Sequence, residues 1–353
     1  MGVADSLNPQ ILHSQPFISM NRITVACIFA LLTFAACPVH AADKIQAKAW
    51  IDPDAARQDD PDFLIQGEYG SASAGATAGV QVVALGNGQF EAQLFQGGLP
   101  GLGWTREKTR RVMKGVRDGD QITFRGAEMK FASIISKGNF ELLGDDGVVV
   151  SLPRIERRSA TLEAKAPSGA IVLFDGSSIE QWENGKMENG FLLSTGCTSK
   201  QLFGDYTLHL EFRTPYMPTA RGQGRGNSGV YHSGRWETQV LDSFGLDGKD
   251  NECGGIYSIS KPLLNMCLPP LSWQTYDVDF TAAKFDASGK RTAWPRITVK
   301  LNGVLVHENL ELHKDFTTSA PITGPLTGPE GPVHLQNHGN PVVYRNIWIW
   351  SPK

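Results

Sequence analysis

Alternation of apolar and polar residues with a period of two is the feature that most constrains the fold of this chain. In the segment 206–213, the alternating apolar positions are Leu208, Leu210 and Phe212. Successive side chains of a β-strand point to opposite faces, so this pattern predicts a strand with one buried face. The 38 glycines and 20 prolines among 353 residues supply the frequent turns that many short strands need.

The second half of the chain repeats this pattern. The same alternation is found in the segments 235–241, 274–280, 296–301, 333–338 and 343–350. Strands with one apolar and one polar face pack as two sheets around a shared core. Asn302-Gly303 predicts a type I′ hairpin turn between two of these strands. We therefore expect an all-β fold in which residues 170–353 form a jelly-roll β-sandwich, with a row of polar side chains along one outer face.

Residues 42–166 predict a smaller β-rich domain that precedes the sandwich. Short strands are expected at 63–69, 79–85, 89–95, 121–124 and 147–150. Gly86-Asn87-Gly88 is a hairpin signal between two of them. The basic stretch 106–117 is interpreted as a solvated turn or sheet edge, and the polar stretch 154–168 as a linker. These residues indicate no activity for this domain.

An apolar run near the N-terminus predicts export. Residues 23–36 (ITVACIFALLTFAA) follow Asn21-Arg22, and Val39-His40-Ala41 places small residues at the usual cleavage positions. About fourteen apolar residues are too few to span a bilayer comfortably, and the arrangement is typical of a secretory signal peptide. We expect residues 1–41 to be leader and signal peptide, the mature protein to be periplasmic or secreted, and no transmembrane span to remain after cleavage.

The surviving cysteines leave their redox state open. Cleavage would leave Cys197, Cys253 and Cys267, an odd number. Cys253 and Cys267 are close enough in sequence to form a disulfide, and they could equally be buried thiols. The net charge of −3 favours neither nucleic acid nor an anionic membrane surface as a partner. A neutral ligand such as a carbohydrate suits this surface.

Two segments of the second half resemble a known family. They are GNSGVYHSGRWETQVLDS at 226–243 and LQNHGNPVVYRNIWI at 335–349. With 172–176 and 252–276, they resemble the family named for 3-keto-glucoside 1,2-lyase and 3-keto-2-hydroxy-glucal hydratase activity, also called 3-keto-disaccharide hydrolase. The resemblance spans residues 171–350. It implies a concanavalin A-like sandwich and an enzyme with a carbohydrate substrate.

The reaction implied by this resemblance starts from a ketone at sugar C3, which makes the C2 proton acidic. A base removes that proton, the C1 substituent leaves by elimination, and water can then add to the enone. This chemistry needs a general base, a group that stabilises the enolate, and donors that hold the sugar. It needs no nicotinamide or flavin, because oxidation to the keto sugar would be the task of another protein.

The catalytic candidates are Glu237, His338 and Arg345. Glu237 projects from the polar face of its strand and is the first candidate for the base, although a surface cross-strand pair is the structural alternative. His338 titrates near neutral pH and could be the base or the acid. Arg345 could stabilise the enolate oxygen or form a salt bridge. The substrate-binding candidates are Asn227, Tyr231, Gln239, Asp242 and Gln336.

The same polar residues predict a divalent cation, such as calcium, bound by Glu237, Gln239 and His338. Two other functions stay open. One is a non-catalytic carbohydrate-binding β-sandwich, because sandwich faces bind sugars without altering them. The other is a hydrolase of unoxidised glycosides, which needs a second carboxylate across the scissile bond from Glu237, with Asp242 or Glu211 as the available partner.

Overall fold

The computed structural model describes residues 47–127, 133–143, 147 and 149–351. Residues 46–353 form one compact unit. The predicted signal peptide, residues 1–41, lies outside the described residues. Among the helices that the structure describes, none has the length and apolar character needed to cross a membrane.

The described chain opens with two short helices, α1 (Pro53–Asp59) and α2 (Pro61–Ile65). The carboxylate of Asp52 caps α1 by accepting hydrogen bonds from two backbone amides of the first turn, and Asp60 caps α2 by accepting one from the Asp62 amide. The prediction of a strand beginning at residue 63 is therefore wrong for residues 63–65. The Asp-Pro start signal outweighs the strand preference of the apolar residues that follow it.

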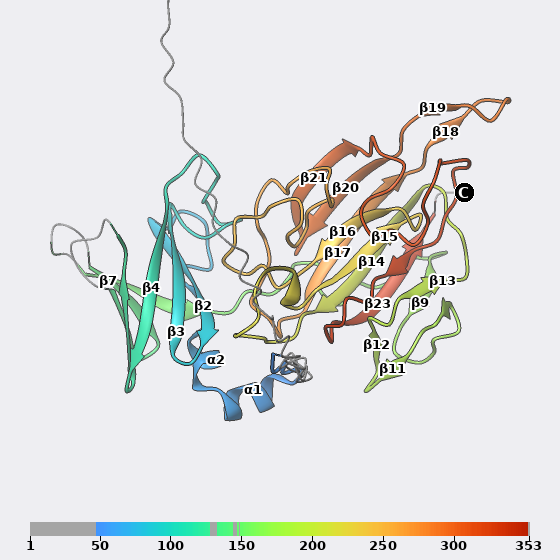
Figure 1. The fold of residues 1–353 in the computed structure, drawn as a ribbon. Helices are drawn as coiled ribbons and strands as arrows, with labels where there is room; N and C mark the ends of the chain where they lie inside the picture. Colours follow the sequence, from blue (N-terminus) through green and yellow to red (C-terminus); the bar gives the residue numbers. More distant parts are fainter. Residues whose placement is uncertain (1–46, 128–132, 144–146, 148, 352–353) are drawn as a thin grey trace, which may run out of the picture. The chain divides into compact units, whose positions relative to one another are not determined.

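A closed antiparallel barrel follows, with its strands in sequence order (Figure 1). β1 pairs with both β2 and β8, which closes the barrel. Phe90, Phe124 and Phe140 pack together in its core. The strands are β1 (Gly67–Tyr69), β2 (Ala78–Gly86), β3 (Gln89–Gln96), β4 (Arg110–Asp118), β5 (Gln121–Arg125), β6 (Ser133–Ser136), β7 (Asn139–Leu143) and β8 (Val149–Ile155).

The β2–β3 hairpin and strand β4 both lie in segments for which the sequence made a prediction. The hairpin predicted at Gly86-Asn87-Gly88 joins β2 to β3, and the positive φ angles of Asn87 (55°) and Gly88 (70°) fit a type I′ turn. The basic stretch 106–117 was interpreted as a turn or edge, which holds for the turn at 106–108 but is wrong for residues 110–117, because β4 pairs with both β3 and β5. Lys114 is exposed and Met113 faces the core, while Arg117 is half-buried and pairs with the buried Asp62 at 2.7 Å.

The sandwich consists of two antiparallel sheets, as predicted. The five-stranded sheet has the order β10 (Trp182–Glu183), β13 (Cys197–Ser199), β22 (His334–Leu335), β15 (Ser228–His232) and β16 (Trp236–Val240). The eight-stranded sheet has the order β11 (Met187–Glu188), β12 (Phe191–Leu193), β23 (Val343–Trp350), β14 (Tyr206–Arg213), β17 (Gln274–Thr281), β20 (Arg296–Leu301) and β21 (Val304–Glu311), with β9 (Ile171–Phe174) paired to β23. A separate hairpin pairs β18 (Lys284–Phe285) with β19 (Arg291–Ala293).

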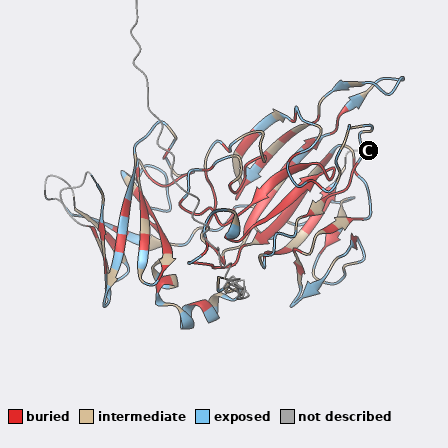
Figure 2. Cartoon of the chain, viewed as in Figure 1, coloured by how far each residue is buried: buried red, intermediate tan, exposed pale blue. Residues whose placement is uncertain are grey.

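The core lies between these sheets, where Figure 2 shows the strands as mostly buried. Leu208, Leu210 and Phe212 of β14 meet Trp236 and Val240 of β16 in one hydrophobic cluster. The alternation in the sequence thus predicts which face of each strand is inside. Cys197, Cys253 and Cys267 are buried free thiols in the structure, so the possible disulfide between Cys253 and Cys267 is not formed.

Candidate functional site

The hairpin of β15 and β16 places four residues of interest in two cross-strand pairs. Tyr231 lies opposite Glu237, and Gly229 lies opposite Gln239. Because the neighbouring Trp236 points into the core, the side chains of Glu237 and Gln239 lie on the other face of the sheet. A Cβ atom on Gly229 would come within 2.1 Å of Glu237 Oε1. The glycine therefore provides the space that the carboxyl group occupies.

The carboxyl group of Glu237 is almost completely buried, with 2% of the residue exposed. Burial raises the pKa of Glu237 to about 8, against the smaller lowering effect of its hydrogen bond with Tyr231. Tyr231 Oη lies 2.9 Å from both Glu237 Oε2 and the carbonyl oxygen of Thr318, and accepts a hydrogen bond from Gln336 Nε2 at 3.1 Å.

A phenol has one proton to donate, whereas Tyr231 faces two acceptor oxygens. If Tyr231 donates to the Thr318 carbonyl, then its contact with Glu237 requires a proton on the carboxyl group. This agrees with the direction of the raised pKa of Glu237. A pKa raised in this direction favours the protonated carboxyl group at neutral pH and makes the carboxylate a stronger base than that of an ordinary glutamate.

A set of amide side chains continues this polar face. Gln223 Oε1 accepts hydrogen bonds from Gln239 Nε2 at 3.1 Å and from Asn227 Nδ2 at 3.0 Å. We call Glu237, Tyr231, Gln336, Gln239, Asn227 and Gln223 the Glu237 cluster. Three of its buried amide oxygens have no hydrogen-bond partner among the described residues, namely Asn227 Oδ1, Gln239 Oε1 and Gln336 Oε1. Unpaired buried acceptors are costly, so their presence on one face indicates a ligand that donates hydrogen bonds, such as a sugar with its hydroxyl groups.

Two members of this site were missed by the sequence analysis. Gln223 lies in the glycine-rich loop 222–226, where a short 3₁₀ turn (Gly222–Gly224) and the hydrogen bond from Asn227 hold its amide group. The carbonyl of Thr318 belongs to a loop that is attached to β16, because Thr317 Oγ1 accepts a hydrogen bond from the Glu237 amide at 3.1 Å. A backbone carbonyl brought from a distant loop leaves no signal in the sequence.

Three of the predicted site residues lie outside the Glu237 cluster. Asp242 is buried in an ion pair with Arg225, with 2.6 Å between its Oδ2 and Arg225 Nε. His338 is exposed in the loop after β22, which ends at Leu335 rather than continuing through residue 338 as predicted. Arg345 belongs to β23, in the other sheet.

The guanidinium group of Arg345 is occupied by a carboxylate of its own sheet. Its Nε donates to Glu211 Oε2 at 2.7 Å, which is the salt-bridge alternative considered for this residue. Burial alone would raise the pKa of Glu211, but a set of hydrogen bonds outweighs it and lowers that pKa to about 2. The donors are His209, Asn346, the backbone amide of Glu163, and Arg345.

The predicted cation ligands are not assembled in the part of the chain that the structure describes. There, no three His, Cys, Asp or Glu side chains come together as a ligand set. The Glu237 cluster offers one carboxyl group and amide oxygens, whereas calcium takes six to eight oxygen ligands, and the third predicted ligand, His338, is exposed in a loop. These donors alone do not fit a protein-built calcium centre, so the requirement for a cation stays a prediction.

The 3-keto-alpha-glucoside-1,2-lyase-like domain matches residues 169–350, just over half of the chain. The chain belongs to this family. The match covers both sheets of the sandwich and contains every residue of the Glu237 cluster. It confirms the family that the sequence resembles, and it places the chain among carbohydrate-active enzymes.

Three crystal structures of predicted glycosyl hydrolases from Parabacteroides distasonis ATCC 8503 are similar to the chain. The structure at 2.13 Å is 34% identical, covering 53% of this chain and 85% of that one with a TM-score of 0.48. The structure at 1.70 Å is 17% identical, covering 56% and 100% with a TM-score of 0.40. The structure at 2.00 Å is 21% identical, covering 52% and 100% with a TM-score of 0.39. No curated protein matches this chain.

Proposed function

We propose that the chain is a 3-keto-glycoside lyase in which Glu237 removes the C2 proton of the sugar. Family membership supports the substrate class. The observation that carries the chemistry is a buried carboxyl group with a pKa raised to about 8, on a face that also holds buried amide oxygens without partners. A base with such a pKa is matched to a weakly acidic C–H bond near neutral pH.

The reaction proceeds in two balanced steps. The Glu237 carboxylate takes the C2 proton, and the electron pair of the broken C2–H bond moves onto the C3 carbonyl as an enolate. The enolate then collapses, a C1=C2 double bond forms, and the C1–O bond breaks, so that the departing alkoxide takes a proton from solvent. Addition of water across the enone, with the hydroxyl at C1, completes the net cleavage.

The remaining members of the Glu237 cluster hold the sugar. The unpartnered oxygens of Asn227, Gln239 and Gln336 accept hydrogen bonds from its hydroxyl groups. Tyr231 adjoins the base directly, and its hydroxyl group orients the Glu237 carboxyl through the 2.9 Å contact. The amide nitrogens of Gln239 and Gln336 are neutral donors in the same cluster that would serve the developing enolate oxygen.

Hydrolysis of unoxidised glycosides is less compatible with this arrangement. That reaction needs a second carboxyl group across the bond from Glu237. Asp242 is already paired with Arg225 inside the protein, and Glu211 lies in the other sheet with Arg345. Both carboxylates that the sequence offered for this role are therefore occupied elsewhere. The proposal retains export to the periplasm or the exterior, where a glycoside substrate would be met.

Product analysis tests this proposal. Purified full-length chain is incubated with a 3-keto-glucoside and with its unoxidised parent, and the products are identified by mass spectrometry. Cleavage of the keto sugar alone is expected, and it should be lost in Glu237→Gln but kept in the matched control Glu308→Gln, whose side chain is exposed on β21. Binding of both sugars without cleavage would instead support the non-catalytic alternative.

The same incubation with a chelator tests the predicted cation. Loss of cleavage that added Ca²⁺ restores would support a requirement for a cation, and its dependence on Glu237, Gln239 and His338 would then be tested by substitution. Unchanged cleavage after exhaustive chelation would show that the reaction needs no cation and depends on the side chains alone.

A further inference from the structure

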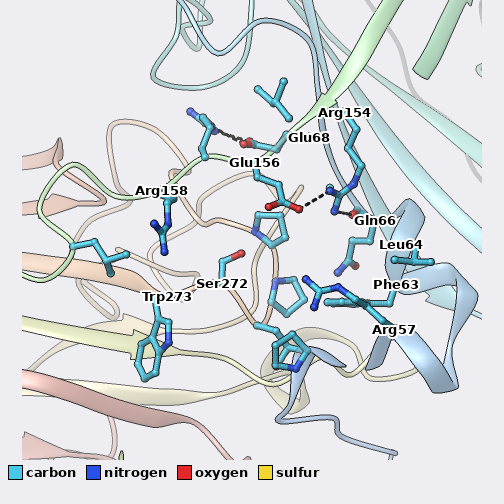
Figure 3. A pocket seen from close by; sticks show the side chains of 18 residues that line it. Arg57, Phe63, Leu64, Gln66, Glu68, Arg154, Glu156, Arg158, Ser272 and Trp273 are labelled. Atoms are coloured by element: carbon cyan, nitrogen blue, oxygen red, sulfur yellow. Dashed lines mark hydrogen bonds and ion pairs between the residues drawn. The ribbon is translucent and has the colours of Figure 1, made fainter. Parts of the chain in front are cut away.

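A cavity of about 570 Å³ lies apart from the Glu237 cluster (Figure 3). Its walls come from the two helices, from the end of β8 with the linker that follows, and from the loop 269–273. None of the residues that line it belongs to the Glu237 cluster. Its volume is in the range of sites that bind small molecules.

Positive charge exceeds negative charge along the cavity wall. Four arginines line it, with only two glutamates and no aspartate among the lining residues. Glu68 is buried and is fully engaged by Arg157, which donates to both of its oxygens. Glu156 binds Arg154 Nη1 at 2.9 Å, and Arg57 Nη1 binds Asp54 at 2.6 Å. Arg158 is exposed and makes no ion pair within the described part of the chain, so its charge is available to a ligand.

Two buried donors on this wall have no acceptor. Gln66 is 1% exposed, and its Nε2 has no hydrogen-bond partner among the described residues, while its Oε1 accepts from the backbone amide of Ala84 at 3.1 Å. The bond from Ala84 fixes which end of the amide is the donor. Arg154 Nε also lacks a partner, although Arg154 Nη2 donates to the Gln66 carbonyl at 3.0 Å. In Figure 3 these two side chains lie next to each other on the same wall.

Apart from Arg57, Arg158 and Ser272, the rest of the wall is mostly apolar. Figure 3 shows Phe63 and Leu64 beside Arg57, with Trp273 and Ser272 across the cavity, and the lining loop also contributes Pro269 and Pro270. Flat apolar surfaces of this kind suit the ring of a sugar, which presents C–H groups on its faces. The cavity thus contains two hydrogen-bond donors without acceptors, and it also has an apolar surface on which a sugar ring can lie.

We propose that this cavity is a second carbohydrate site, which binds an acidic sugar. The oxyanion of the sugar, a carboxylate or a phosphate, accepts hydrogen bonds from Arg154 Nε and Gln66 Nε2, and the ring lies against Phe63 and the two prolines. Arg158 lies across the cavity beside Trp273 and attracts the anion without contacting it. The site requires the carbohydrate class of the family but not the lyase chemistry of Glu237. It adds a subsite that selects charged saccharides.

Titration calorimetry of the purified full-length chain tests this proposal, with glucuronate, glucose 6-phosphate and glucose as probes. We expect at least one of the two acidic sugars to bind and glucose to bind at least about tenfold more weakly, which is the size of one charge-assisted hydrogen bond. The tighter of the two acidic sugars identifies the oxyanion that the site prefers. Equal affinity for glucose, or binding of neither acidic sugar, would overturn the proposal.

Substitutions at Arg158 and Gln66 test whether the acidic sugar binds in this cavity. Arg158→Gln removes the exposed charge without touching the core, and Gln66→Glu keeps the acceptor for Ala84 but replaces the free donor with a negative oxygen. Gln66→Glu should weaken binding of the acidic sugar at least about tenfold, and Arg158→Gln should weaken it less, because the Arg158 charge acts without contact. Arg111→Gln removes an exposed charge from β4 and should leave affinity unchanged. Undiminished binding in both Arg158→Gln and Gln66→Glu would contradict the proposed site.

Discussion

Gly229 makes room for the carboxyl group of Glu237. The two residues lie on neighbouring strands, and a Cβ atom on Gly229 would stand 2.1 Å from Glu237 Oε1 and 2.8 Å from its Cδ. No real contact is that short, so the position of the proposed base depends on the absence of a side chain at residue 229. The raised pKa of Glu237 depends on the same close packing, which excludes water from the carboxyl group.

Gly229→Ala should therefore displace the carboxyl group of Glu237. Because a shift of about 1 Å at a reacting group can cost about 100-fold in rate, we expect a loss of that order in kcat/KM for a 3-keto-glucoside. The strain should lower the free energy of unfolding by about 1–3 kcal/mol. Gly328→Ala is the control, since a Cβ there meets no atom within 4 Å. Wild-type kinetics in Gly229→Ala would show that the carboxyl position is not critical.

The raised pKa of Glu237 predicts how stability changes with pH. Between the ordinary value of 4.5 and the folded-state value of about 8, the folded protein holds a proton that the unfolded chain has lost. The free energy of unfolding should therefore fall as the pH rises through this window, by up to about 1.4 kcal/mol per pH unit from this group. Glu237→Gln should lack this decline, so it should gain stability relative to the wild type from pH 5 to pH 9. The free energy of unfolding is measured with urea at each pH for both proteins. If the two curves of free energy against pH run parallel, the pKa of Glu237 is not raised.

The same pKa predicts the pH dependence of the reaction. Only the deprotonated carboxylate can accept the C2 proton, so kcat/KM should rise with pH and level off above about pH 8. Initial rates for a 3-keto-glucoside at low substrate concentration, measured from pH 5 to pH 10, give this profile. Glu308→Gln should reproduce it. A profile that is flat from pH 5 to pH 8 would mean that the base is another group.

Arg345→Gln separates structural from catalytic roles at this position. The change removes the 2.7 Å hydrogen bond to the buried Glu211 carboxylate, so the free energy of unfolding should fall by about 1–3 kcal/mol. Because Arg345 lies in the sheet opposite the Glu237 cluster, kcat/KM well below the unfolding temperature should stay within about twofold of the wild type. A large loss of kcat/KM with unchanged thermal unfolding would restore the catalytic role predicted from the sequence.

Local patterns in the sequence predicted the strands and their faces well. β14 and β23 begin and end at the predicted residues, because alternation with a period of two follows directly from burial of one face. The same reasoning placed Glu237 and Gln239 on the face opposite Trp236. Asn302, with φ of 55°, and Gly303, with φ of 78°, form the predicted turn between β20 and β21.

The remaining differences between the predicted and the observed structure depend on interactions between residues that are far apart in the sequence or in a turn. The polar alternation up to His338 suggested a longer β22, but Asn337 Oδ1 accepts a hydrogen bond from the Gly339 amide and forms a turn there. The partner of Asp242 is Arg225, and a buried partner is not visible in the sequence of either strand. Likewise, the pattern of β23 shows that Arg345 is on a polar face but not which of the two sheets contains that strand.

The central claim is that Glu237 breaks the C2–H bond of a 3-keto sugar, and a kinetic isotope effect tests it most directly. Rates are compared for a 3-keto-glucoside that carries hydrogen or deuterium at C2, under conditions that report kcat/KM at pH 9. The account predicts a primary isotope effect clearly above unity in the wild type, and a loss of cleavage in Glu237→Gln. Rapid cleavage with an isotope effect of unity, undiminished in Glu237→Gln, would contradict it.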